Sequence, residues 1–167
     1  CGVVAGDSIF LGADNGLLIY NYKTDHYVTA EVSFPNDVRS LAFYKNNLWI
    51  GTLNGLYRYT LNTHELKAFT PYNSRLPHVA VYSLLHTSDG ELYIGTYDGV
   101  CRLDETGNDF YLIGIPAARR EKNFFANIML EDKERKCLWI GTEGELICLR
   151  YGRAESIPLF QDNSVKS

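Results

Sequence analysis

The stretch LWIGTLNGLYRY, residues 48–59, contains two short apolar runs separated by a Gly-Thr step and an Asn-Gly pair. Aromatic and β-branched residues are frequent in both runs, and such side chains pack well on the pleated surface of a sheet. Asn and Gly tolerate positive φ angles, so the Asn-Gly pair predicts a hairpin turn whose two central residues both have positive φ. The stretch therefore predicts a β-hairpin.

Nearly the same phrase occurs four times in the 167-residue chain, which indicates an internal repeat. Successive copies are offset by 39, 44 and 46 residues, measured at the Gly of the Gly-Thr or Gly-Ala step. This period is typical of the four-stranded blade of a β-propeller. The fourth copy reads as one residue shorter, with Glu143-Gly144 at the turn. The copies are IFLGADNGLLIYNY (9–22), LWIGTLNGLYRYTL (48–61), LYIGTYDGVCRLDE (92–105) and LWIGTEGELICLRY (138–151).

Further apolar runs flank the copies, so each repeat has four candidate strands joined by short polar turns. Four-stranded sheets that follow one another with this period fit radially stacked blades. We therefore predict an all-β fold, a β-propeller segment of about four four-stranded antiparallel blades, although residues 124–136 also permit a helix. The flanking runs lie at 26–32, 38–44, 65–70, 79–86, 109–114, 124–131 and 154–160.

The phase of the repeat bears on how the blades are arranged. Residues 1–5 match the later half of the strand predicted at 38–44, and residues 163–167 match the early half. The two halves would either meet and close a four-bladed ring or belong to a longer array of blades, and we expect the longer array. We predict a single propeller segment over 1–167, with repeats at approximately 1–35, 36–77, 78–122 and 123–162, and 163–167 starting a next blade.

The composition argues against several classes of function. The net charge is −4 and no run of Lys or Arg is longer than Arg119–Arg120, so we expect no nucleic-acid partner. No run of 18 apolar residues is present, so we expect no direct membrane insertion by this segment. Phosphate-binding, dinucleotide-binding, zinc and nucleophile motifs are also missing, so we predict no cofactor, no metal site and no catalytic residue.

The four cysteines, at positions 1, 101, 137 and 148, have no CxxC spacing and are expected to act as small apolar residues. Cys101 and Cys148 take matching places in adjacent repeats. Equivalent strands of stacked sheets lie about 10 Å apart, which is too far for a disulfide. We therefore expect no bridge between them, and Cys137 with Cys148 is the only plausible pair.

Residues shared by the repeats favour architectural roles. Trp49 and Trp139 are expected inside strands and buried between blades, because a packed aromatic ring removes a large apolar area from water. The glycine of each Gly-Thr step indicates close packing of strands. The hydroxyls of Thr52, Thr96 and Thr142 are expected to satisfy backbone groups at the turns.

The repeat resembles the two-component regulator propeller repeat, whose pattern is V-x-S-L/I, a polar turn, L-W-I-G-T, a short turn and G-L-x-R-Y/L. Residues 38–63 match this pattern almost throughout, and residues 81–107 match it with Tyr93 in place of Trp. The fourth copy departs at Glu145, and the first copy departs most. The resemblance spans essentially the whole chain.

This resemblance implies a non-enzymatic sensing part of a membrane-bound hybrid histidine kinase. Such propellers usually form the periplasmic region of these sensors in Bacteroidetes-type bacteria, and many of the sensors detect breakdown products of complex glycans. The implied partners are an oligosaccharide or acidic sugar and further blades of the same parent chain, and a homo-oligomer is also possible. The rival interpretations are a propeller enzyme, a polysaccharide lyase or glycosidase, and a propeller that binds only proteins.

Loops between the fourth strand of one blade and the first strand of the next differ from repeat to repeat. Loops on a rigid scaffold commonly carry binding residues. Planar polar groups beside an aromatic ring suit sugar hydroxyls, and arginines suit an acidic sugar or another carboxylate. The ligand-binding candidates are Tyr72, Asn73, Arg75 and His78 in one loop, and Arg119, Arg120, Lys122 and Asn123 in the next.

Overall fold

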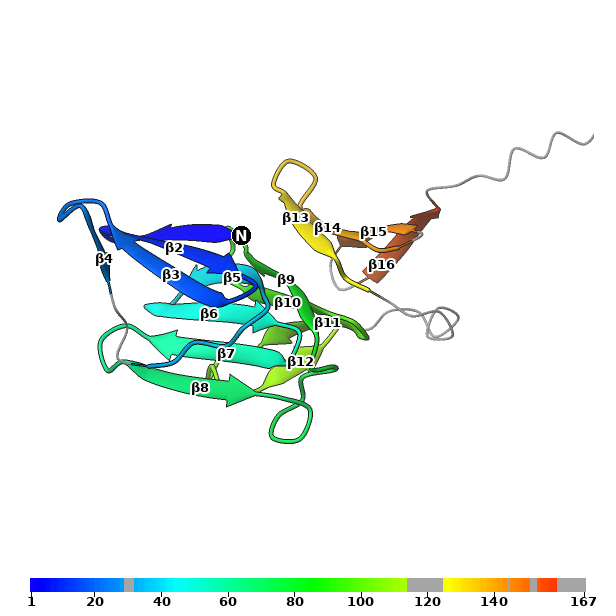
Figure 1. The fold of residues 1–167 in the computed structure, drawn as a ribbon. Helices are drawn as coiled ribbons and strands as arrows, with labels where there is room; N and C mark the ends of the chain where they lie inside the picture. Colours follow the sequence, from blue (N-terminus) through cyan, green and yellow to red (C-terminus); the bar gives the residue numbers. More distant parts are fainter. Residues whose placement is uncertain (29–31, 114–124, 144, 151–152, 159–167) are drawn as a thin grey trace, which may run out of the picture.

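The computed structural model describes residues 1–28, 32–113, 125–143, 145–150 and 153–158. They form four antiparallel sheets of four strands each, and the strands of every sheet follow one another in chain order. Figure 1 shows the sheets succeeding one another along the chain. The predicted all-β fold of four-stranded blades is therefore confirmed. None of the described residues forms a helix with the length and apolar character that a membrane span requires.

The sheets are called blades 1 to 4 in chain order, and their strands have the following bounds. Blade 1 contains β1 (Gly2–Ala5), β2 (Ser8–Ala13), β3 (Gly16–Asn21) and β4 (His26–Val28), and blade 2 contains β5 (Val38–Tyr44), β6 (Asn47–Thr52), β7 (Gly55–Thr60) and β8 (Glu65–Phe69). Blade 3 contains β9 (Val81–His86), β10 (Leu92–Thr96), β11 (Gly99–Leu103) and β12 (Phe110–Leu112), and blade 4 contains β13 (Ile128–Asp132), β14 (Cys137–Gly141), β15 (Glu145–Arg150) and β16 (Arg153–Pro158).

The first strand of each blade is the inner strand, because it lies against the first strand of the next blade. β1 contacts β5, β5 contacts β9 and β9 contacts β13. The helix considered for residues 124–136 is wrong at 128–132, where β13 pairs with β14 from Ile128 opposite Gly141 to Asp132 opposite Cys137. Pairing with the neighbouring strand satisfies the backbone groups that a helix would satisfy internally.

The Asn-Gly turns differ from the predicted type. Thr52 pairs with Gly55, so the two central residues are Leu53 and Asn54, and neither has positive φ. Gly55 follows them with φ 142°, a conformation that favours glycine. The Thr52 hydroxyl accepts the N–H of Asn54 at 3.0 Å and donates to the Gly55 carbonyl at 2.9 Å, so this side chain shapes the turn. The predicted role of the threonines is confirmed, since Thr96 and Thr142 donate in the same way to Gly99 and Glu145.

The repeat glycine in the second strand is the point at which the following blade makes its close contact. A Cβ atom on Gly51 would lie 2.7 Å from Cγ1 of Val81, the first residue of the next inner strand, and 2.4 Å from the hydroxyl oxygen of Ser40. Val38 approaches Gly12 in the same way, and Ala126 approaches Gly95. Only a residue without Cβ allows this approach, as predicted for these glycines.

The apolar core lies between successive blades. Three clusters of buried side chains join blades 1 and 2, blades 2 and 3, and blades 3 and 4. Trp49 is 1 % exposed and stacks on Phe69 with ring centroids 5.5 Å apart, and Phe69 meets Phe110 of blade 3 edge-on at 5.5 Å. The predicted burial of Trp49 between blades is confirmed.

Trp139 behaves differently, and its predicted burial is wrong in degree. It lies in β14 at the position equivalent to Trp49, yet it is only partly buried, and its indole N–H donates to Asp132 at 3.3 Å. Within the described residues, blade 4 has no following blade to cover this face. The same residue type is therefore buried or partly exposed according to whether a next sheet packs on it.

The cysteines are free thiols, and one predicted alignment is wrong. Cys148 pairs with Trp139, whereas Cys101 pairs with Ile94, so Cys148 corresponds to Arg102 and lies on the opposite face of its blade. The fourth hairpin is not shorter than the others, because Glu145 takes the place of Gly99 three residues after the threonine. Burial raises the pKa of both the Cys101 and Cys148 thiols, which keeps them neutral.

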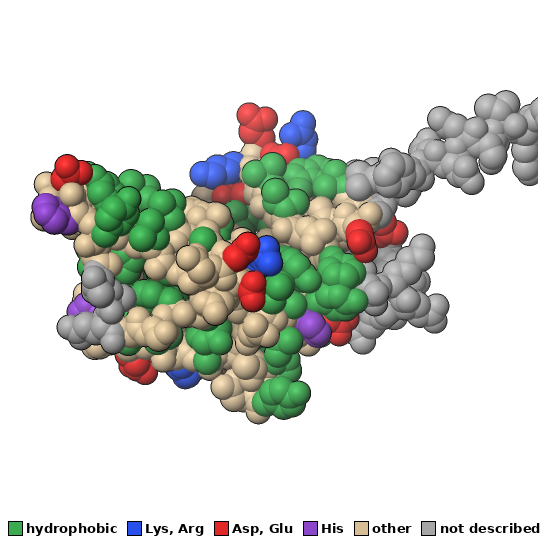
Figure 2. Space-filling model, in the orientation of Figure 1, with side chains coloured by type: hydrophobic (Ala, Val, Ile, Leu, Met, Phe, Trp, Pro, Cys, Tyr) green, Lys and Arg blue, Asp and Glu red, His purple; other side chains and the backbone are tan. Residues whose placement is uncertain are grey.

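Both outer faces of the described arc are apolar. On blade 1, Leu11 and Leu18 are opposite each other and are 43 % and 45 % exposed, whereas Ile50, the residue of blade 2 equivalent to Leu11, is fully buried against blade 1. On blade 4, Ile128 and Leu130 are also exposed. Figure 2 shows hydrophobic side chains gathered over β2–β4 and over β13. These faces have the character of blade interfaces without their partners.

Trp49→Ala should lower the free energy of unfolding by about 3–5 kcal/mol, the usual loss for a large core aromatic. Trp139→Ala should cost clearly less, because part of its ring already meets water and no further described blade packs on it. Urea unfolding of the two variants measures the difference. Equal losses would contradict the inter-blade role of Trp49.

Gly51→Ala should destabilise the protein by about 1–3 kcal/mol, because its Cβ would displace Val81 and Ser40. Gly141→Ala is the matched control. Its Cβ would lie 2.8 Å from the Cγ2 methyl of Ile128, an exposed side chain of the same blade, and not against a described following blade. In thermal unfolding, Gly51→Ala should have a clearly lower melting temperature than Gly141→Ala. The reverse order would contradict the role of Gly51 in positioning the next blade.

Candidate functional site

The four predicted residues of the loop between β8 and β9 do not form one site. Tyr72 is 95 % exposed, and Asn73 holds the loop together by donating to the Ala68 carbonyl at 3.1 Å and accepting the Thr70 N–H at 2.8 Å. The Arg75 guanidinium pairs with Asp109 of blade 3 at 3.4 Å. These contacts place the first half of the loop beside the outer strands of blades 2 and 3.

His78 lies apart from the other three residues, at the beginning of the inner strand β9. Its ring is 4.9 Å from that of Tyr97, and its Nδ1 atom accepts the N–H of Ala80 at 3.0 Å. Tyr97 is fixed in turn because its N–H donates to the Ala80 carbonyl at 3.0 Å. Of the four predicted residues of this loop, only His78 therefore lies at the inner edge of the blades.

Two more aromatic rings complete a group at this edge. Tyr97 meets Phe125 edge-on at 4.0 Å, and Phe125 meets Tyr82 of β9 at 5.9 Å. All four rings are partly buried, so each keeps some surface in contact with solvent. We call His78, Tyr82, Tyr97 and Phe125 the mouth cluster. It joins the N-terminal ends of the inner strands β9 and β13.

One feature of the sequence indicates this cluster, and it lies outside the loops that connect the blades. Tyr97 occupies the variable position directly after the repeat threonine or alanine, where the other copies have Asp14, Leu53 and Glu143. An aromatic residue at a turn that otherwise holds unrelated side chains departs from the architectural pattern. The predicted residues Arg119, Arg120, Lys122 and Asn123 lie outside the described residues.

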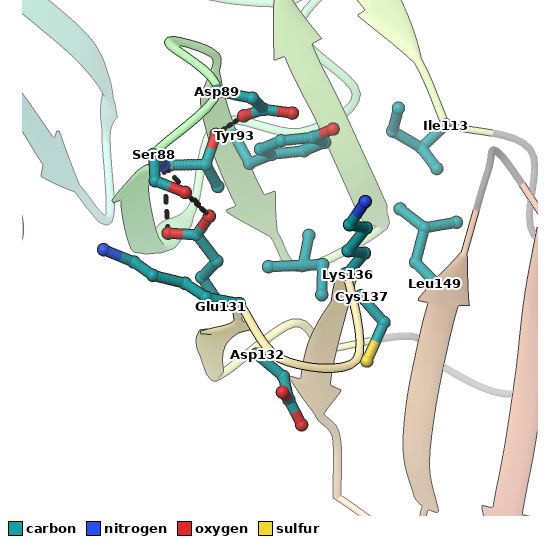
Figure 3. Close-up of a pocket in the computed structure, with 12 residues that line it drawn as sticks. Ser88, Asp89, Tyr93, Ile113, Glu131, Asp132, Lys136, Cys137 and Leu149 are labelled. Carbon is teal, nitrogen blue, oxygen red and sulfur yellow. Dashed lines mark hydrogen bonds between the residues drawn. The ribbon is translucent and has the colours of Figure 1, made fainter.

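A pocket of about 520 Å³ opens between blades 3 and 4, at the opposite end of β9 from the mouth cluster (Figure 3). The turn after β9 is joined to β13 across it, because the Ser88 N–H donates to both carboxylate oxygens of Glu131, at 2.9 and 3.0 Å, and the Ser88 hydroxyl donates to the same group. Its walls are apolar on one side, where Ile113, Leu138 and Leu149 line it.

The carboxylates near this pocket have structural partners. Asp132 accepts hydrogen bonds from the backbone N–H and the guanidinium of Arg135, both at 2.9 Å. These bonds hold the pKa of Asp132 at about 2, well below its usual range. Glu131 accepts the hydrogen bonds of Ser88. Both carboxylates therefore hold the structure of their turns together. Within the described ranges, no group of His, Cys, Asp and Glu has the arrangement of a metal site.

Comparison with known proteins finds similarity to two component regulators. Residues 75–98 match the family model of the two component regulator propeller. The chain is 40 % identical to the extracellular domain of BT4673 from B. thetaiotaomicron, with a TM-score of 0.87, and the two structures of that domain describe BT4673 as a one component system and as a hybrid two component system. This similarity covers 96 % of the present chain and 22 % of the other, so the chain spans less than a quarter of that relative.

More distant structures share the fold. The extracellular domain of BT3049 from the same organism, also assigned to a hybrid two component system, is 20 % identical over 95 % of this chain and 21 % of its own, with a TM-score of 0.74. A streptogramin B lyase is 13 % identical over 98 % of this chain and 55 % of its own, with a TM-score of 0.73. Identities this low show the fold alone. The curated proteins contain no match.

Proposed function

We propose that this chain, whose residues 75–98 match the two component regulator propeller model, is the ligand-sensing part of the extracytoplasmic region of a hybrid two component sensor. In this proposal the region lies in the periplasm, and a histidine kinase elsewhere in the parent protein carries the signal. The segment itself binds and does not catalyse. The relative with 40 % identity supports this assignment, since one of the two structures of its extracellular domain describes it as such a system.

The mouth cluster is the observation that carries the sensing function. Its four partly buried rings come from loops, a turn and an inner strand. A hydrogen bond from the Ala80 N–H holds the His78 ring, and a second one holds the backbone of Tyr97. Aromatic faces held in this way pack against the C–H faces of sugar rings, while the phenol and imidazole groups hydrogen-bond the hydroxyls. We therefore propose an oligosaccharide released from a complex glycan as the ligand. An acidic sugar is favoured if the Arg119–Arg120 loop also contributes.

Tyr97→Ala should weaken binding of the cognate oligosaccharide by about tenfold or more, as expected for loss of a central aromatic contact. Tyr72→Ala is the control, because Tyr72 is almost fully exposed beside the outer strands. Calorimetric screening of an oligosaccharide panel, followed by titration of both variants, measures this. Product analysis of the same mixtures tests the enzymatic alternative. Oligosaccharide cleavage, or equal losses in the two variants, would overturn the proposal.

The outer faces of blades 1 and 4 support a second part of the proposal, that the segment packs between further blades of its parent. The exposed Leu11 matches Ile50, Ile94 and Ile140, which are all buried against a neighbouring blade. The exposed Leu18 matches Tyr57, which is partly buried, and Cys101 and Ile147, which are buried. A third exposed residue, Tyr27, adjoins them and lines the same shallow hollow. Apolar faces of this kind are covered in stable repeat proteins by another repeat or by a polar cap.

The isolated chain should therefore associate with copies of itself as its concentration rises. Light scattering over a concentration series measures this directly. The double variant Leu11→Lys/Leu18→Glu should associate less, because it places an opposite-charge pair on the outer face of blade 1 without introducing like charges across the strands. A chain that stays monomeric at all concentrations would contradict this part of the proposal and leave the sensing function untouched.

A further inference from the structure

The pocket between blades 3 and 4 lies where two large side chains of the preceding interface are replaced by smaller ones. In blade 2, Trp49 pairs with Arg58, and in blade 3 the equivalent Tyr93 pairs with Arg102. Likewise Phe69 lies opposite Leu56, whereas Ile113 donates its N–H to the equivalent residue, Val100.

These replacements turn a filled interface into a hollow one. Between blades 2 and 3 the stacked Trp49 and Phe69 rings occupy this position, while Tyr93 and Ile113 line the pocket of about 520 Å³ between blades 3 and 4. Pockets that bind small molecules have this range of volume and are mainly apolar with a few polar groups.

The polar groups around the pocket divide into two kinds. The carboxylates have partners: Asp89 accepts the Thr87 hydroxyl at 2.5 Å, and Glu131 and Asp132 are held by Ser88 and Arg135. The donors do not. Within the described ranges, the ammonium groups of Lys133 and Lys136 and the hydroxyl of Tyr93 have neither a hydrogen bond nor an ion pair.

Two of these donors, Lys136 and Tyr93, lie beside the apolar wall. Figure 3 shows the Lys136 ammonium directed toward Tyr93, and Ile113 and Leu149 lie on the other side of Lys136. Asp132 points away from the pocket. Lys136 has φ 49°, a left-handed conformation that a residue with a Cβ adopts only at some cost. A cation and a phenol next to an apolar surface are complementary to an anion carried on an apolar body.

We propose that this pocket is a second binding site, which takes a small carboxylate with an aromatic or aliphatic body. The carboxylate is bound by Lys136 and the Tyr93 hydroxyl, and the body packs on Ile113, Leu138 and Leu149. The site is separate from the mouth cluster, since the two lie at opposite ends of β9. Its ligand contacts both blades 3 and 4 and so stabilises their junction.

Naphthalene-2-carboxylate is a suitable probe, with the uncharged naphthalene-2-carboxamide as its control. In saturation-transfer NMR titrations of the full chain, the acid should bind about tenfold or more tightly than the amide, the ratio expected for a charge-assisted hydrogen bond. Lys136→Met should abolish this preference, and Tyr93→Phe should reduce it. Lys45→Met is the matched control, because Lys45 lies in the equivalent turn of blade 2 and should leave binding unchanged.

A second pair of variants guards against trivial loss of structure. Lys136→Gly suits φ 49° and should keep or raise the melting temperature while losing the acid preference. Tyr93→Trp with Ile113→Phe rebuilds the aromatic pair of the preceding interface, and it should raise the melting temperature and abolish probe binding. Acid and amide binding with equal affinity, unchanged acid binding in Lys136→Met, or unchanged binding in the filled variant would each overturn the proposal.

Discussion

Blades 2, 3 and 4 each make a close contact with a glycine of the blade before. The first residues of the inner strands, Val38 and Val81, and Ala126 just before β13, occupy the space where a Cβ of the preceding glycine would stand. This approach sets the distance between consecutive inner strands, and the other three strands of each blade follow by pairing outward. The repeat glycine is therefore the contact through which one sheet positions the next.

Alternation along the second strand then distributes the core. Side chains on a strand point to opposite faces in turn, so Trp49 faces blade 3 while Leu48 and Ile50 face blade 1. Every blade is consequently apolar on both faces, and the core forms only where two blades meet. This explains why equivalent residues such as Trp49 and Trp139 differ in exposure, because burial is a property of the interface and not of the blade.

The sequence predicted the sheets well because period, turn residues and apolar alternation all indicated the same strands. It predicted the length of the fourth hairpin and the type of the turns less well, because these depend on how the strands pair. Matching Gly144 to Gly99 by residue type suggested a shorter hairpin, whereas the bond from Thr142 to Glu145 preserves its length. The turn type was missed because a threonine side chain, rather than positive φ at both central residues, satisfies the backbone.

The candidate site was harder to predict, for a related reason. The loop after β8 has to cross from the outer edge of blade 2 to the inner edge of blade 3, so neighbours in sequence such as Arg75 and His78 end beside different strands. Proximity in a loop therefore did not predict proximity in space. The aromatic partners of His78 come from a turn and from an inner strand, and only knowledge of how blades 3 and 4 meet brings them together.

A repeat of this kind makes its own exceptions visible. Trp49 of the second strand and Phe69 of the fourth strand stack in the interface after blade 2. Their equivalents in blade 3 are the smaller Tyr93 and Ile113, which line the pocket, so the preceding interface is the reference against which this pocket is recognised. The same comparison singles out Tyr97, an aromatic residue at a turn position that is otherwise variable and non-aromatic. Both departures fall at the junction of blades 3 and 4. Architecture is shared by all the blades, so the residues that distinguish one junction from the others are the ones left for recognition.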